Sequence, residues 1–216
     1  QSPILIVIIR SLCSLSIPPP PPPTFFFFSP LSLYLLFFWL LFFQTGFSGI
    51  AVAQQGDSLA FPAAWSGVWS GTLDIYGGKG KVQSVGMEIE ILKIDTSTQG
   101  RYTFSLIYGG RDKDYRPYEL VPVDASKGLW RVDEKNTIVM ESYLYGPKLL
   151  CWFVVEGSRI LCSYEKTDDR TLIFEVVSGR ETPVSVTGNT KTDKEDISEV
   201  KTFPVSVFQR AVLKRK

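Results

Sequence analysis

Apolar and polar residues alternate one by one through most of residues 54–216, and no stretch repeats with the 3.6-residue period of a helix. Residues 85–91 are typical, because Val85, Met87, Ile89 and Ile91 alternate with glycine and glutamate. Such a segment is predicted to form a strand with one face in the core and the other in water. A chain made of many such strands has to bury all of their apolar faces together, which indicates an all-β fold.

The alternation defines ten predicted strands separated by turn-forming residues, at 68–76, 85–91, 101–108, 116–123, 128–133, 137–145, 148–155, 159–165, 171–178 and 200–212. Residues 179–199 are polar and rich in Gly, Thr and Lys, and they are predicted to form one long loop. Short connections predict an antiparallel up-and-down β-barrel of about eight to ten strands, because closure removes the edges of a sheet. The alternative is a two-sheet sandwich, which needs longer Greek-key connections.

The hairpin around residues 134–136 carries a specific register prediction. A three-residue loop there, with left-handed backbone at its last residue, sets Trp130 opposite Met140 and Val132 opposite Ile138. Both pairs are apolar, and a slip by one residue would break the match.

Two cysteines, Cys151 and Cys162, lie in a second predicted hairpin. A turn at residues 156–157 places them directly opposite each other, within the range of a disulfide, so one bond is predicted in an oxidising compartment. A turn at residues 157–158 would instead offset them and leave two buried free thiols. The third cysteine, Cys13, lies far upstream.

Residues 1–53 are predicted to be a leader outside the fold. Residues 31–43 are an uncharged apolar run, and Ala51-Val52-Ala53 fits a signal-peptidase site, so cleavage is predicted before Gln54. The alternative is a signal anchor over residues 31–53. The cleaved leader predicts a secreted or periplasmic protein whose residues 54–216 form one lipocalin-like barrel domain.

The first thirty residues are unusual in composition. Pro, Phe, Ser and Leu dominate them from residue 16 onward, and codons for these residues begin with two pyrimidines. Residues 1–30 are therefore interpreted as a translated pyrimidine-rich tract, with a polyproline II spacer as the alternative.

Charge and composition exclude several functions. The chain contains 23 Lys and Arg, 22 Asp and Glu and no His, and Arg10 is the only charged residue in residues 1–53. Residues 54–216 are therefore formally neutral, which argues against nucleic-acid binding. Without histidine there is no His-based triad, HExxH zinc site or His-ligated haem. No catalytic residues, cofactor, metal site or membrane span are predicted for residues 54–216, and the protein is predicted not to be an enzyme.

The first predicted strand begins with a short motif, WSGVWSG at residues 65–71. Gly67-Val68-Trp69 resembles the Gly-x-Trp signature of the lipocalins, in the calycin superfamily. The resemblance implies that Trp69 plugs one end of the barrel and that an arginine late in the chain stacks on it, for which Arg210 is the matched position. It also implies a small apolar or amphipathic ligand inside the barrel.

Arg116 and Tyr118 share one strand face and could together clamp a ligand carboxylate. The pair is similar to the Arg-x-Tyr pair of fatty-acid-binding proteins. The alternative is an arginine at the rim with Tyr118 in the core. The other predicted ligand contacts are Tyr102, Phe104, Trp130 and Met140.

The inward-facing rings could also fill the barrel completely. A filled barrel predicts an interaction module that works through its outer surface or through residues 179–199. Four apolar residues are predicted to point outward: Leu150, Trp152, Val154 and Leu161. They are predicted either to form a dimer or partner surface or to lie beneath the loop at 179–199.

Overall fold

The computed structural model describes residues 61–96, 99–193 and 195–216. The predicted leader at residues 1–53, its cleavage before Gln54 and Cys13 lie outside the described residues. Within the described ranges, no helix is long and apolar enough to cross a membrane.

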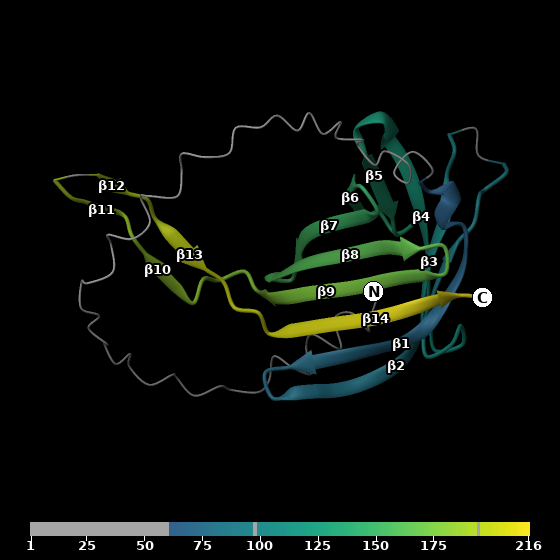
Figure 1. The fold of residues 1–216 in the computed structure, drawn as a ribbon, viewed down its shortest axis with the longest axis horizontal. Helices are drawn as coiled ribbons and strands as arrows, with labels where there is room; N and C mark the ends of the chain where they lie inside the picture. Colours follow the sequence, from purple (N-terminus) through teal and green to yellow (C-terminus); the bar gives the residue numbers. More distant parts are fainter. Residues whose placement is uncertain (1–60, 97–98, 194) are drawn as a thin grey trace, which may run out of the picture. The chain divides into compact units, whose positions relative to one another are not determined.

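Ten antiparallel strands close into one barrel, which confirms the predicted fold class (Figure 1). Each strand pairs with its neighbour in the chain, and β14 closes the barrel between β9 and β1. The barrel strands are β1 (Gly67–Gly77), β2 (Gly80–Ile91), β3 (Tyr102–Tyr108), β4 (Asp114–Asp124), β5 (Leu129–Asp133), β6 (Val139–Tyr145), β7 (Lys148–Val155), β8 (Ser158–Asp168), β9 (Thr171–Arg180) and β14 (Val207–Arg215).

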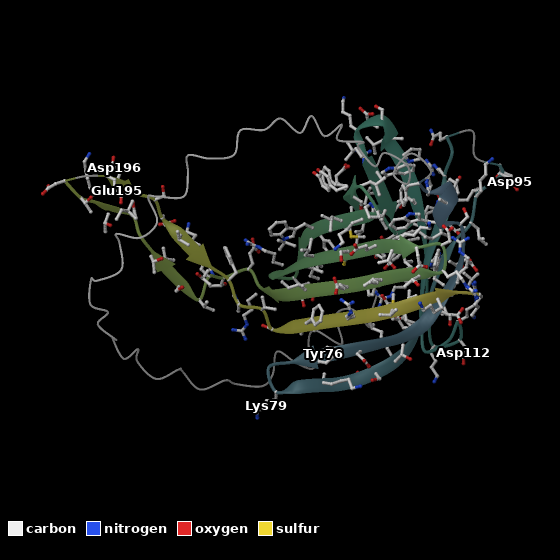
Figure 2. All side chains as sticks on the ribbon, viewed as in Figure 1. Tyr76, Lys79, Asp95, Asp112, Glu195 and Asp196 are labelled. Carbon is white, nitrogen blue, oxygen red and sulfur yellow. The ribbon has the colours of Figure 1, made fainter. Side chains whose placement is uncertain are left out.

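The predicted long loop at 179–199 is wrong. The chain there forms two small two-stranded sheets, whose strands are β10 (Ser185–Thr187) with β13 (Val200–Thr202) and β11 (Thr190–Lys191) with β12 (Asp196–Ile197). Asp196 is the first residue of β12, and Glu195 directly precedes it (Figure 2). Strands of two or three residues are too short to show an alternation of apolar and polar residues. The polar composition of this segment therefore indicated a loop. The last barrel strand consequently begins at Val207 and not at residue 200.

One end of the barrel is closed by aromatic rings. A short 3₁₀ turn, η2 (Ala63–Trp65), lies just before β1. The Phe61 ring meets Trp65 edge-on at a centroid distance of 4.8 Å and Trp130 at 5.0 Å. Trp69 is completely buried beside them. These rings form an apolar floor beneath the barrel interior.

The cross-strand register decides which residues face each other inside. In the β7–β8 hairpin the prediction is confirmed, because Cys151 pairs with Cys162. In the β5–β6 hairpin it is wrong by two residues, since Val132 pairs with Met140 and Trp130 with Ser142. A shift of two keeps every side chain on its own face, so hydrophobic alternation cannot detect it.

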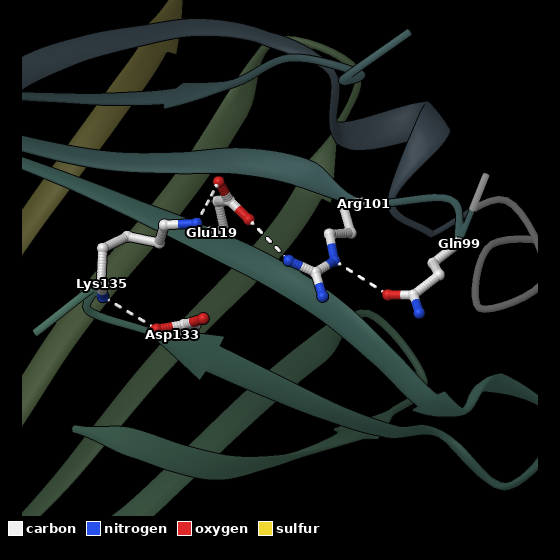
Figure 3. A network of polar contacts seen from close by, with 5 residues as sticks. All are labelled: Gln99, Arg101, Glu119, Asp133 and Lys135. Atoms are coloured by element: carbon white, nitrogen blue, oxygen red, sulfur yellow. Dashed lines mark hydrogen bonds and ion pairs between the residues drawn. The ribbon is translucent and has the colours of Figure 1, made fainter. Parts of the chain in front are cut away.

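The loop between β5 and β6 explains this shift. The Lys135 backbone N–H donates to the Asp133 carboxylate at 2.8 Å, and the Lys135 ammonium pairs with Glu119 on β4 at 2.9 Å (Figure 3). Left-handed backbone occurs at Lys135, with φ of 63°, and not at Asn136. Side-chain hydrogen bonds thus favour a longer loop than the predicted three-residue turn.

Gly71 is required by the close approach of β14 to β1. A Cβ atom there would lie 2.5 Å from the Val212 carbonyl oxygen and 3.1 Å from a Leu213 methyl group. We expect Gly71→Ala to lower the free energy of unfolding by about 2–3 kcal/mol, because the backbone of β14 has to move. Urea unfolding followed by tryptophan fluorescence measures this change.

The matched control is Gly86→Ala on β2. No atom lies within 4 Å of a Cβ at Gly86, and the position is exposed. Its stability is expected to stay the same or to rise slightly, because alanine restricts the unfolded chain. Equal losses in the two variants would contradict the explanation for Gly71.

Candidate functional site

The barrel floor combines Trp69 with an arginine, but this arginine is Arg215. The Arg215 guanidinium carbon lies 4.5 Å from the Trp69 ring centroid. Its Nη2 donates to the Ala64 carbonyl oxygen at 2.8 Å, and the Trp69 indole N–H donates to the Trp65 carbonyl oxygen at 2.9 Å. The tryptophan and the arginine therefore tie η2, β1 and the end of β14 together.

The prediction of Arg210 for this role is wrong. Arg210 pairs in register with Asp74 and forms an ion pair with Glu175 on the outer face of β9. Its neighbours Gln209 and Ala211 are the residues buried on the inward face. Successive side chains of a strand point to opposite faces, so Arg210 points outward and cannot reach Trp69, whereas Arg215 lies on the inward face.

This correction gives a direct test. Arg215→Ala is expected to lower the free energy of unfolding by about 2 kcal/mol, through loss of the cation–π contact and of the charged hydrogen bond. Arg210→Ala removes only a partly exposed ion pair and is expected to cost less than half as much. Urea denaturation of both variants checks the difference, and a larger loss for Arg210→Ala would restore the original assignment.

The six predicted ligand contacts all lie on the inward face of the barrel wall. Cross-strand partners share a face, and Phe104 pairs with Tyr118 while Met140 pairs with the buried Val132. These contacts come from four consecutive strands, β3 to β6: Tyr102, Phe104, Arg116, Tyr118, Trp130 and Met140.

Arg116 is buried and its partner is Asp114. Only 6% of Arg116 is exposed, so the alternative of an arginine at the rim is wrong. Its Nε and Nη2 donate to the two Asp114 carboxylate oxygens at 3.2 and 3.0 Å. Burial is the largest single influence and lowers the pKa of Arg116, but the hydrogen bonds to Asp114 and the electrostatic interactions with Tyr108, Tyr118 and Asp114 together outweigh it and leave the pKa above its ordinary value. Arg116 is therefore a permanent cation.

Two tyrosines flank this ion pair. The Arg116 guanidinium carbon lies 5.1 Å from the Tyr108 ring centroid. Burial raises the pKa of Tyr118 to about 12, against the opposing charge of Arg116, and raises the pKa of Tyr108 well above its ordinary range. Both hydroxyls are therefore neutral hydrogen-bond donors at neutral pH.

The polar side chains extend across the interior to β8. The Tyr164 ring packs between Phe104 and Phe174, at centroid distances of 4.9 and 5.1 Å. Burial raises the pKa of Tyr164 well above its ordinary range, and the neighbouring Cys162 and Tyr108 raise it further. We call the following residues the interior polar cluster: Tyr108, Asp114, Arg116, Tyr118, Cys162 and Tyr164.

Cys151 and Cys162 are free, buried thiols, so the predicted disulfide is not present. Burial raises the pKa of both thiols. At neutral pH both thiols are therefore uncharged. The two cysteines lie directly opposite each other in the β7–β8 register, as predicted. Their sulfur atoms are not bonded, so the alternative of two buried free thiols describes their chemical state.

Trp130 and Ser142 are buried polar side chains that face each other across the β5–β6 pair. The Trp130 indole N–H has no hydrogen-bond partner among the described residues, whereas the Ser142 hydroxyl interacts with the Cys151 thiol. Buried polar groups in proteins are almost always paired, so the Trp130 indole N–H favours a further partner inside the barrel.

The predicted outer apolar cluster is exposed. Trp152 is 66% and Val154 48% exposed, and Leu150 and Leu161 are half-buried. The alternative that residues 179–199 cover this cluster is therefore wrong.

Sequence reasoning missed Asp114 as a site residue. The predicted strand began at Arg116, whereas β4 begins at Asp114. The signal was present as an i, i+2, i+4 series of Asp114, Arg116 and Tyr118, which puts all three on one face of an extended strand.

Comparisons with known proteins give structural matches only. A scan against protein-family models found no match, and a search of curated proteins found none. One solved structure that matches is a protein of unknown function of the DUF3598 family from Nostoc punctiforme, at 10% identity and a TM-score of 0.49. Another is the S-type phycobiliprotein lyase CPES from Guillardia theta, at 7% identity and a TM-score of 0.46. Each match covers 71% of this chain, with 48% of the Nostoc protein and 89% of the Guillardia protein.

The second match corrects the prediction that this protein is not an enzyme. A protein of similar structure carries the name of a lyase, so that exclusion was wrong. It rested on the missing histidine, which removes particular catalytic centres, whereas Tyr, Cys, Asp and Lys can also transfer protons.

Proposed function

We propose that this protein is a calycin-like barrel that binds a small apolar or amphipathic ligand in its interior. The observation that carries the proposal is the interior polar cluster on a largely apolar inner wall, which also holds the unpaired Trp130 indole N–H. Small-molecule sites combine a mostly apolar lining with a few convergent polar groups in this way. Arg116 and Tyr118 would contact the polar end of the ligand, and Phe104, Tyr102 and Met140 its apolar part.

The test is a titration with N-phenyl-1-naphthylamine, an uncharged fluorescent apolar probe. We expect saturable binding to one site with enhanced fluorescence. Met140→Trp places a larger side chain on the inward face and is expected to weaken binding by about tenfold or more, equivalent to about 1.4 kcal/mol. Val139→Trp is the matched control, because Val139 is the adjacent residue and points outward, half-exposed.

Absence of saturable binding, or an equal effect of the two variants, would contradict interior binding. Native mass spectrometry of the protein from its own host supplies an independent readout, since a retained ligand adds its mass. Trp152→Ser serves as a second control and is expected to leave probe binding unchanged.

A second proposal concerns the outer surface. The exposed Trp152 and Val154, with Leu150 and Leu161 beside them, are proposed to form a dimer or partner surface. Sedimentation velocity of the wild type and of Trp152→Ser tests this proposal for a dimer. A wild type that stays monomeric at high concentration would contradict self-association.

Export is also proposed, and it rests on the apolar run at 31–43 and on the small residues before Gln54. N-terminal sequencing of the protein from its own host is expected to start at Gln54. A chain that keeps residues 31–53 would instead support the signal anchor.

A further inference from the structure

We infer that the polar end of the ligand is an uncharged hydrogen-bonding group, such as an alcohol or a carbonyl, and not a carboxylate. This inference rests on the proposed function and concerns the chemistry of the same site. It corrects the carboxylate clamp that Arg116 and Tyr118 suggested from the sequence alone.

The first step is the occupancy of Arg116. Asp114 accepts hydrogen bonds from Nε and Nη2, at 3.2 and 3.0 Å, and so takes one bidentate edge of the guanidinium. A ligand carboxylate would prefer an edge of this kind. The protein thus supplies its own carboxylate where a ligand carboxylate would bind.

The second step is the charge of the site. The side chains of Arg116 and Asp114 are only 7% and 11% exposed, so the two charges are weakly screened and together neutral. A carboxylate that entered beside them would lie close to Asp114 without a second cation from the interior polar cluster. Like charges at such distances, and the desolvation of the incoming anion, both oppose binding.

The third step is the set of groups that remain. A guanidinium has five N–H groups, and Asp114 uses two of them. The neutral Tyr118 hydroxyl hydrogen-bonds with Arg116 and Glu134, and the Tyr108 ring centroid lies 5.1 Å from the Arg116 guanidinium carbon. Each hydroxyl has a donor and two acceptor lone pairs, so both can also bond an uncharged ligand group. A hydroxyl or carbonyl oxygen satisfies such donors without bringing a charge into the interior.

The experiment compares two ligands of equal chain length, 1-dodecanol and dodecanoate, as competitors of N-phenyl-1-naphthylamine at pH 7.5. We expect the wild type to bind the alcohol about tenfold or more tightly than the acid. Asp114→Asn frees the Arg116 charge with little change in volume and is expected to tighten dodecanoate binding by about tenfold, with the alcohol changed less than threefold. Asp112→Asn is the matched control, because Asp112 is exposed in the connection before β4.

The outcomes separate the two proposals. Tighter binding of dodecanoate than of dodecanol by the wild type would overturn this inference and leave interior binding standing. Failure of Asp114→Asn to improve dodecanoate binding would overturn it as well. If Asp114→Asn does not fold, the preference of the wild type between dodecanol and dodecanoate decides alone. If the wild type does not bind N-phenyl-1-naphthylamine at all, the proposed function itself is overturned.

Discussion

Arg116→Met is expected to lower the free energy of unfolding by about 3–5 kcal/mol at neutral pH, because it leaves the Asp114 carboxylate buried without its partner. The double variant Arg116→Met with Asp114→Leu is expected to recover most of this loss. Well-packed apolar side chains replace buried ion pairs at little cost, whereas a single unpaired charge is costly. Urea unfolding followed by tryptophan fluorescence measures both variants.

The matched control is Arg111→Met. Arg111 pairs with Glu90 at 2.6 Å and lies over the Tyr115 ring, but its side chain is 53% exposed. Water replaces the lost contacts of an exposed ion pair, so the control is expected to lose much less stability. Two results would show that the interior pair is well solvated. One is a loss of unfolding free energy for Arg116→Met no larger than that for Arg111→Met, and the other is a double variant less stable than Arg116→Met alone.

The contrast between these two arginines also shows how far the sequence could predict the site. Strand alternation placed Arg116, Tyr118, Phe104 and Trp130 on one face correctly, because a period of two fixes the face of each residue. It could not locate Asp114, because residues 112–114 have the composition of a turn. The predicted strand therefore began one inward position too late, and it left out the partner that neutralises Arg116.

Two other corrections have related causes. The inward face of β14 is difficult to identify from the sequence, because the polar Gln209 interrupts its apolar pattern while Phe208 and Val212 make the outward face look apolar. The register of β5 and β6 was missed because alternation repeats every two residues and only the loop contacts of Lys135 distinguish the choices. The number of strands and the inward set followed from local pattern, whereas partners across strands depend on hydrogen bonds in the loops.

Alkaline pH is expected to unfold the barrel cooperatively. Burial raises the pKa of Tyr108, Tyr118 and Tyr164 above the value near 10 that applies to an unfolded chain. Above pH 10 the unfolded state therefore loses protons that the folded state retains. The free energy of unfolding then falls by about 1.4 kcal/mol per pH unit for each such tyrosine, until the pH reaches that group's folded pKa.

This limit is close to pH 12 for Tyr118. By that pH the combined loss from three tyrosines reaches about 8 kcal/mol, which is comparable to the whole stability of a typical domain. Absorbance at 295 nm, which reports tyrosinate, is therefore expected to rise in one steep step for these three side chains between pH 11 and 12, together with loss of the near-ultraviolet circular dichroism.

Tyr118→Phe removes one of the three ionisations and is expected to shift the step to higher pH, while Tyr145→Phe, which changes an exposed ring, is expected to leave it in place. A gradual titration of all described tyrosines near pH 10 with unchanged circular dichroism would place Tyr108 and Tyr164 in contact with water. It would then contradict a closed, dry wall around the interior polar cluster, because ionised phenols are tolerated only where solvent or a second cation reaches them.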